Sequence, residues 1–168
     1  MRTPLRIFVL LLLPGMWFLL PESAQPAEVP PNIRTSDDLA VVVNGKNDIS
    51  DLSSPELRRI LLGEKRFWHN KAPVMLILRE PGARERDEVL TVLLKMTNSE
   101  FGQYWRDKVF RGEAPASPLA VPSNGLVSQY VFDTPGGITF IAGKNLRPDL
   151  KVLKIDGRLP GDPQYPLK

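Results

Sequence analysis

The sequence predicts an α/β protein with a mostly parallel sheet flanked by helices, on three observations. A short apolar run rich in β-branched residues, Leu39 to Val43, is typical of a buried strand. The turn signal Asn44-Gly45 ends that strand, and an amphipathic helix opens at Ser53-Ser54-Pro55-Glu56. A buried strand that leads into an amphipathic helix is typical of half of a parallel βαβ unit.

The first helix carries signals at both of its ends. Ser53 or Ser54 is expected to cap the free amides, with Pro55 in the first turn and Glu56 reaching back to the cap. Gly63 is expected to end the helix. One face of the helix gathers the apolar side chains Leu57, Ile60 and Leu61, and Trp68 follows in the next loop.

Further elements follow in alternation. A second buried strand is predicted over 74–78, and a helix over 83–96 follows the turn Arg79-Glu80-Pro81-Gly82. Asn98-Ser99 is expected to cap another helix, which ends near Gly112. Aromatic side chains recur along that helix, and we expect them to pack against the sheet: Tyr104, Trp105 and Phe110.

The last part of the chain predicts a loop, a short helix and two strands. Three prolines within 113–123 predict a loop. Ser123-Asn124 is expected to cap a short helix, and the turn over 134–137 leads into a strand over 138–142. A last strand is expected over 150–155, so the predicted domain spans residues 39–157.

The N-terminal segment is typical of an export signal. Arg2 and Arg6 precede an apolar run that is too short to span a bilayer, so a signal peptide over 1–27 and a periplasmic location are predicted. An uncleaved signal that anchors the protein is the alternative, because the candidate cleavage sites lack a small residue three positions upstream. The proline-rich segments over 28–38 and 158–168 are expected to be an extended leader and tail.

Composition narrows the class of function. The net charge of +3, from 22 basic and 19 acidic side chains, is too small to imply a nucleic-acid partner. The absence of cysteine excludes disulfides, thiolate metal sites and thiol catalysis. With a single histidine, no nucleophile elbow and no nucleotide-binding fingerprint, the sequence predicts no enzyme, no cofactor and no metal site.

The turn after the second strand is the best candidate for a binding site. The first turn of a helix presents free backbone amides that suit an anion, and guanidinium groups would add donors. In open α/β sheets, ligands bind beyond the carboxyl ends of the strands, where this turn is expected. The candidate ligand-binding residues are Arg79, Gly82, Ala83, Arg84 and Arg86.

The same turn has an alternative interpretation as a solvated helix start. Glu85 and Glu88 are interleaved with the arginines, and we expect them on a solvent-facing side, ion-paired with Arg84 or Arg86. Carboxylates in these positions would compete for the guanidinium groups and repel an anion. This alternative predicts a surface with charges of both signs and no ligand.

The order and spacing of these features resemble the second lobe of periplasmic solute-binding proteins, specifically the phosphate-binding family of ABC importers. In that family a Val-rich strand ends in Asn, a Leu-Ser-Pro-type helix ends in Gly, and a Trp follows, as they do here from Leu39 to Trp68. The match continues through Phe101 to Gly112 and through Pro135 to Phe140, and covers roughly 39–157. The resemblance implies one lobe of a periplasmic-binding-protein-like (type 2) fold, phosphate as ligand, and ABC importer membrane subunits as partners.

The sequence departs from that family's pattern at the candidate site. Where the family carries Ser-Gly-Thr at the helix start, this chain has Ala83-Arg84-Glu85, so two hydroxyl donors are lost and a carboxylate appears where phosphate would lie. The leading hypothesis is a non-enzymatic lobe that binds at most a small anion, with Asn44 at the neighbouring strand end as a secondary contact. The alternative is a ligand-free envelope module that keeps the fold and binds a partner protein or a second copy.

Overall fold

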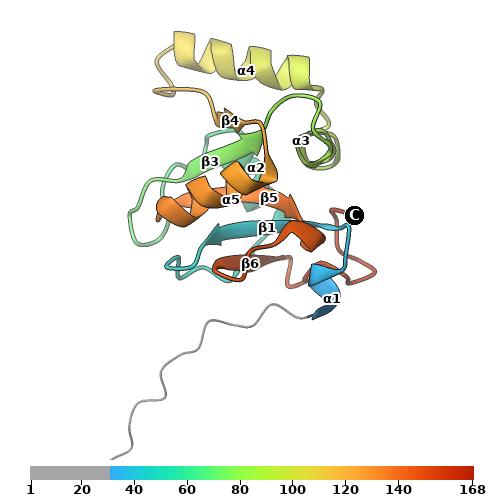
Figure 1. Ribbon diagram of the computed structural model, residues 1–168. Coiled ribbons are helices and arrows are strands. Elements are labelled where there is room, and N and C mark those ends of the chain that lie inside the picture. The colour runs from blue at the N-terminus through green and yellow to red at the C-terminus, as the bar shows by residue number, and fades with distance from the viewer. Residues whose placement is uncertain (1–30) are drawn as a thin grey trace, which may run out of the picture.

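Six strands form one mixed sheet in the computed structural model, which describes residues 31–168. The order across the sheet is β2-β6-β1-β5-β3-β4, and helices cover both faces (Figure 1). The strands are β1 (Leu39–Asn44), β2 (Asp51–Leu52), β3 (Met75–Arg79), β4 (Leu119–Val121), β5 (Gly137–Ala142) and β6 (Leu150–Ile155). The helices are α1 (Pro31–Arg34), α2 (Ser54–Leu61), α3 (Arg84–Val89), the π-helix η1 (Leu90–Leu94), α4 (Asn98–Phe110), α5 (Asn124–Asp133) and the 3-10 helix η2 (Gly143–Asn145).

The predicted class, a mostly parallel sheet flanked by helices, is confirmed, but one prediction about its topology was wrong. β3 is parallel to β4 and β5, and β2 is parallel to β6, whereas β1 is antiparallel to both of its neighbours, with Val41 opposite Phe140 and Leu153. β1 and α2 are therefore not half of a parallel βαβ unit. The next strand, β3, lies beyond β5 and runs opposite to β1, because the strand-helix pattern does not fix the direction of the strand that follows.

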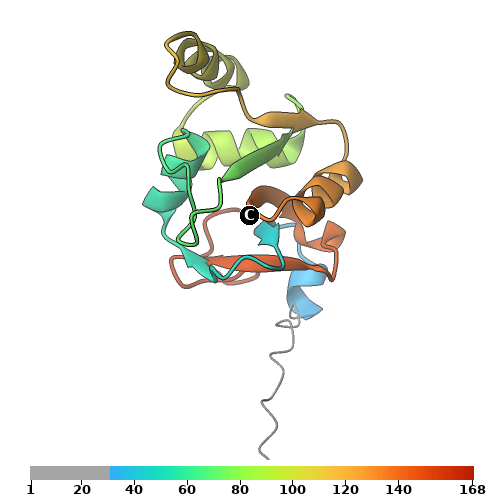
Figure 2. The same cartoon turned by 90° about the vertical axis from the view of Figure 1, so that its left-hand side faces the viewer.

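The sheet separates two apolar cores. Leu39, Val41 and Val43 face the larger core, which β1 shares with α2, η1 and α4, and the alternate residues Ala40 and Val42 face a smaller core under α5. Figure 2 shows α2 and α5 on opposite sides of the sheet. Because β1 is covered on both faces, all six of its residues are buried, which explains why it is a continuous apolar run in the sequence.

The predicted capping of α2 is confirmed. The Ser53 side chain accepts a hydrogen bond from the Glu56 amide, and a Glu56 carboxylate oxygen accepts from the Ser53 amide at 3.2 Å. Lys65 donates to the same carboxylate at 2.9 Å, and this bond, with those from Ser53, lowers the pKa of Glu56 to about 2. Helix α4 is capped one residue earlier than expected, because Thr97 and Glu100 form its capping box.

Two predicted elements differ in the structure. The predicted loop over 113–123 contains β4, which pairs with β3 between Pro118 and Pro122. Prolines are tolerated at the ends of an edge strand, so their presence hid this strand in the sequence. The helix predicted over 83–96 is α3 followed by the π-helix η1, which ends at Leu94 and is capped by Lys95 with a φ of 59°.

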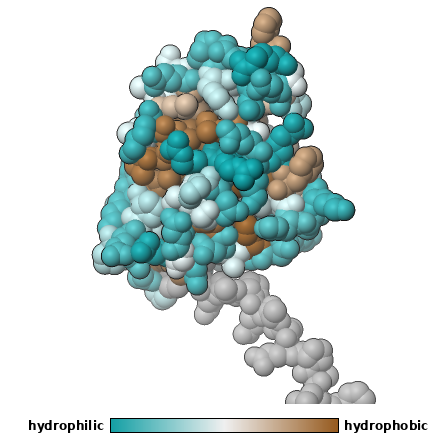
Figure 3. All heavy atoms as spheres, turned by 180° about the vertical axis from the view of Figure 1, so that it is seen from behind, coloured by the Kyte–Doolittle hydropathy of each residue, from teal (hydrophilic) through white to brown (hydrophobic). Residues whose placement is uncertain are grey.

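The aromatic residues of α4 divide into two groups. Trp105 is buried and its indole N–H donates to the carbonyl of Leu61 at 3.2 Å, while Tyr104 donates to the carbonyl of Leu62 at 2.9 Å. The prediction that Phe110 packs against the sheet was wrong, because the last turn of α4 projects beyond the core and leaves Phe110 92% exposed. Elsewhere the rear of the domain is mainly hydrophilic, with apolar side chains gathered in its upper half (Figure 3).

Both end segments of the described chain pack onto the domain. Within the predicted leader, α1 buries Ile33, and the predicted tail has no helix or strand but buries Tyr165 and Leu167 in the larger core. The Tyr165 hydroxyl donates to the carbonyl of Leu39 at 2.8 Å, and burial raises the pKa of Tyr165 above its usual range. The predicted signal peptide over 1–27 lies outside the described residues, among which no helix is long and apolar enough to cross a membrane.

Candidate functional site

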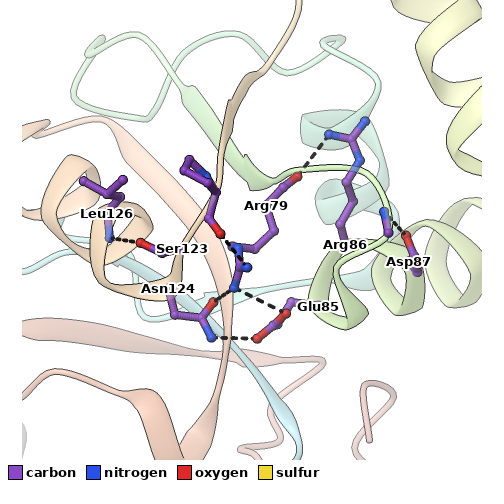
Figure 4. Close-up of polar contacts among 9 residues, drawn as sticks. Arg79, Glu85, Arg86, Asp87, Ser123, Asn124 and Leu126 are labelled. Carbon is purple, nitrogen blue, oxygen red and sulfur yellow. Dashed lines mark hydrogen bonds and ion pairs between the residues drawn. The ribbon is translucent and has the colours of Figure 1, made fainter.

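Arg79 is the last residue of β3, so it stands at the carboxyl end of this strand, where the sequence predicts a site. Its guanidinium group reaches across to the start of α5 (Figure 4). Nη1 donates to Oδ1 of Asn124 at 2.6 Å, and Nη2 donates to the carbonyl of Pro122 at 2.8 Å. The direction of the Arg79 side chain is therefore set by the segment between β4 and α5.

Glu85 supplies the counter-charge of Arg79. Its Oε2 lies 3.8 Å from Nη1 of Arg79, and its Oε1 accepts a hydrogen bond from Nδ2 of Asn124 at 2.8 Å. The two charged side chains are only 17% and 12% exposed. Glu85 was expected on a solvent-facing side with Arg84 or Arg86; instead the first turn of α3 points it inward. We call Arg79, Asn124 and Glu85 the Arg79 cluster.

Arg86 belongs to a different part of the structure. It is 8% exposed, its Nε donates to Oδ1 of Asn98 at 2.7 Å, and its Nη1 donates to the carbonyl of Arg79 at 3.1 Å. Its guanidinium carbon lies 5.4 Å from the centre of the Phe101 ring. Burial lowers the pKa of Arg86, an effect opposed by the charge of Asp87. Figure 4 shows the guanidinium groups of Arg79 and Arg86 pointing away from each other. Through its bond to Asn98, the first residue of α4, Arg86 joins α3 to α4.

Arg84 points outward and is neutralised by other residues. Its Nη2 lies 3.3 Å from Glu88 and donates to the carbonyl of Asp37 at 3.0 Å. The predicted pair of Arg84 with Glu88 is confirmed. Glu88 does not lie on a solvent face, however, because its side chain is only 16% exposed and burial raises its pKa. Arg84 therefore adds no free positive charge to the Arg79 cluster.

The backbone of the turn leaves the first amides of α3 uncapped. Gly82 has a φ of 88°, a conformation that favours glycine, and its N–H donates to Oδ1 of Asp87 at 3.3 Å. Ala83 is the N-cap of α3 and has no side chain to cap the first amides. Within the described part of the chain, the amides of Arg84 and Glu85 consequently have no acceptor.

Asn44 is the last residue of β1, which is antiparallel to β3, so it lies at the end of the sheet opposite to the carboxyl end of β3. Its Nδ2 donates to the carbonyls of Val131 and Phe132 at 3.0 and 2.6 Å, and its Oδ1 accepts from the Lys46 amide at 2.9 Å. These bonds join the end of β1 to the last turn of α5. The structure therefore does not bring Asn44 together with Arg79, and one small ligand does not reach both.

The residue that sequence reasoning missed is Asn124. It was identified only as a possible helix cap, whereas Ser123 is the cap of α5 and the Asn124 side chain bonds both Arg79 and Glu85. The signal available in the sequence was the pair Ser123-Asn124, in which one residue suffices as the cap. Finding its partners would have required the pairing of β4 with β3.

The donors and acceptors of the Arg79 cluster are largely paired with one another. Nε of Arg79 is buried and has no hydrogen-bond partner among residues 31–168. The carboxylate of Glu85 lies beside Nη1 of the same guanidinium group. Among residues 31–168, no group of three or more His, Asp or Glu side chains is arranged to hold a metal ion.

Comparison with known proteins gives related sequences and folds. No protein-family model matches the chain. It is 27% identical over 123 residues to the phosphate-binding protein PstS of Bacillus subtilis. Its fold is similar to an ABC-type phosphate transport receptor from Vibrio cholerae (TM-score 0.59, 18% identity) and to PstS from Borrelia burgdorferi (TM-score 0.58, 22% identity). The resemblance to the substrate-binding proteins of phosphate ABC transporters is thus confirmed.

The similarity covers most of this chain but only part of its relatives. It includes 73% of this chain and 37% of the Bacillus protein, and 74% of this chain with 48% and 49% of the two solved structures. The chain thus spans less than half the length of these relatives. This coverage fits a single-lobe version of the fold.

Proposed function

We propose that this chain is a periplasmic solute-binding-like protein of the phosphate-importer type, and that it binds at most a small anion, weakly, at Arg79. The observation that carries the proposal is the position of Arg79 at the carboxyl end of β3, with the open amides of α3 close by in the chain. Guanidinium and amide donors together suit phosphate or a carboxylate.

Glu85 sets the limit on affinity. An anion that approaches Arg79 meets a carboxylate 3.8 Å from the guanidinium group, so it must compete with an internal ion pair. An intramolecular competitor is always present at high effective concentration, and binding is weakened accordingly. If the protein serves an importer, it would pass the anion to the membrane subunits and carry out no chemical reaction.

Thermal unfolding at low salt, with phosphate, sulfate or acetate added, tests this proposal. A ligand at 100 times its dissociation constant stabilises a protein by about 2.7 kcal/mol, so a weak binder responds only at millimolar concentrations. We expect a small rise in melting temperature that Arg79→Ala abolishes. Arg59→Ala is the matched control, because Arg59 is exposed and lies on α2, away from the site. A flat response that is identical in the wild type and Arg79→Ala would reject anion binding.

The second candidate is a ligand-free interaction module of the envelope. The specific observation that favours it is the internal counter-charge, since Nη1 of Arg79 is hydrogen-bonded to Asn124 and paired with Glu85 without any ligand. This candidate expects no response to anions and a partner protein or second copy bound elsewhere on the surface. Sedimentation analysis over a range of protein concentrations tests the second copy directly.

A further inference from the structure

A groove runs beneath α4 on the side of the edge strand. It consists of two adjoining hollows of about 280 and 210 Å³, which share Trp105, Ser117 and Pro118 as lining residues. Figure 1 shows α4 lying above β4, with the connecting segment descending at one end. The groove is therefore bounded by α4 on one side and by residues 114–120 on the other.

The walls of the first hollow present apolar side chains to solvent. Phe67 is 56% exposed, Met75 is 45% exposed, and Leu119 is 38% exposed, and all three line this hollow. Trp105 and Ile60 close its inner side. Exposed apolar side chains that converge on one concave surface are typical of a binding site rather than of ordinary surface.

The edge strand adds main-chain groups. Within residues 31–168, β4 ends the sheet and pairs only with β3. The Val121 carbonyl accepts from the Glu80 amide at 3.1 Å, so Val121 faces β3. Because the hydrogen-bonding groups of successive strand residues point to opposite sides, the N–H and carbonyl of Ala120 face the free edge. Ala120 also lines the second hollow, so these groups are available along the groove.

The charges along the groove have one sign. Four charged side chains line the two hollows and all are cationic: Lys65, Arg66, Arg86 and Arg106. Lys65 is paired with Glu56 and Arg86 is buried, so the exposed charges are those of Arg66 and Arg106, one at each hollow. An occupant of complementary chemistry is apolar and carries negative charge.

We infer that this groove binds an extended peptide of a partner protein that combines apolar residues with flanking acidic residues. The main chain of the peptide adds to the free edge at Ala120, its apolar side chains enter the two hollows, and its carboxylates meet Arg66 and Arg106. Side chains two residues apart on a strand are separated by about 6.6 Å, so one extended segment supplies successive side chains to adjoining hollows. This inference rests on the second candidate function, the interaction module, and is independent of anion binding.

Selection from a random dodecamer library displayed on phage, with the full-length protein as bait, tests the inference. We expect enrichment of sequences that combine acidic and apolar residues, and the best peptide is then measured by fluorescence anisotropy. Arg66→Glu combined with Arg106→Glu should weaken its binding at least ten-fold. The matched control combines Lys46→Glu with Lys154→Glu, which makes the same charge change at exposed positions outside the groove and should alter affinity less than two-fold.

Other results would overturn the inference. One is a selection that does not enrich acidic and apolar residues. Another is a peptide that binds the Arg66→Glu/Arg106→Glu variant as well as it binds the wild type. A third is tight binding of decanoate, an apolar anion without a peptide backbone, when no peptide is selected. The experiments distinguish a failure of the peptide inference from a failure of either proposed function, anion binding or the ligand-free module. Arg79→Ala should leave peptide binding unchanged, and an anion-induced thermal shift would count against the ligand-free module while leaving the peptide measurement intact.

Discussion

Replacing Glu85 by Gln tests whether this carboxylate occupies the anion position beside Arg79. At 3.8 Å and an effective dielectric constant of about 20, the Coulomb attraction between the two charges is about 4 kcal/mol before the cost of desolvation. Gln keeps an oxygen that accepts the hydrogen bond from Asn124. The variant therefore loses the charge and little else, and we expect the free energy of unfolding to fall by about 1–3 kcal/mol.

The same substitution should strengthen the response to anions. Without the internal carboxylate, Arg79 keeps its bonds to Asn124 and to the Pro122 carbonyl but lacks a counter-charge. Phosphate then supplies that charge, and at 100 times its dissociation constant it would restore about 2.7 kcal/mol. The assay is urea denaturation of wild type and Glu85→Gln, with and without phosphate at constant ionic strength.

Glu88→Gln is the matched control for this experiment. It makes the same chemical change on the same helix, but its carboxylate pairs with Arg84 rather than with Arg79. We expect no gain in phosphate response from this variant. The reasoning is refuted if Glu85→Gln unfolds at the same urea concentration as the wild type and responds to phosphate no more strongly than Glu88→Gln.

Three further predictions concern the stability of the fold. Gly63→Ala should cost about 2–5 kcal/mol by urea denaturation, because residue 63 has a φ of 65° and an added Cβ lies 2.5 Å from the Trp105 ring. Tyr165→Phe should cost about 1 kcal/mol through the lost bond to the Leu39 carbonyl. Since the folded state raises the pKa of Tyr165, wild-type stability should fall as pH rises above about 10, and this fall should be absent from the variant. Glu56, with its pKa lowered to about 2 from an ordinary 4.5, should contribute stability that is lost as pH falls between these values, a loss absent from Glu56→Gln.

Each of these predictions has a clear contrary outcome. If the Gly63→Ala variant is as stable as the wild type, the Trp105 ring shifts freely to make room for the added Cβ. An alkaline profile that Tyr165→Phe leaves unchanged would assign the titration to other groups, and an acid profile that Glu56→Gln leaves unchanged would assign the acid titration to other carboxylates.

Local signals in the sequence predicted the local structure well. Ser53 and Glu56 lie three residues apart in the pattern of a capping box, and the structure contains both of its hydrogen bonds. The β-branched run of β1 predicted a buried strand, and all six of its residues are buried. These features depend on neighbours in the chain, so a single sequence contains the information needed to infer them.

Long-range pairings account for the wrong predictions. The direction of β1 depends on its pairing with β5 and β6, which lie about a hundred residues away in the chain. Pairing with β3 also makes β4 a strand despite its flanking prolines. The position of Glu85 follows from these pairings, because Asn124 reaches it only after β4 brings the start of α5 beside β3.

The geometry of the Arg79 cluster bears on how a binding site is recognised from sequence. Arg79 is held by the Pro122 carbonyl and by Asn124, so its position and direction do not depend on a ligand. An arginine at this place in the fold is therefore compatible with a site that binds an anion and with one that binds none. Glu85 is different, because a carboxylate beside the guanidinium group contributes to stability while it competes with every external anion. The residue at position 85, rather than the arginine, is consequently the one whose chemistry decides between an anion receptor and a lobe that keeps the fold for another purpose.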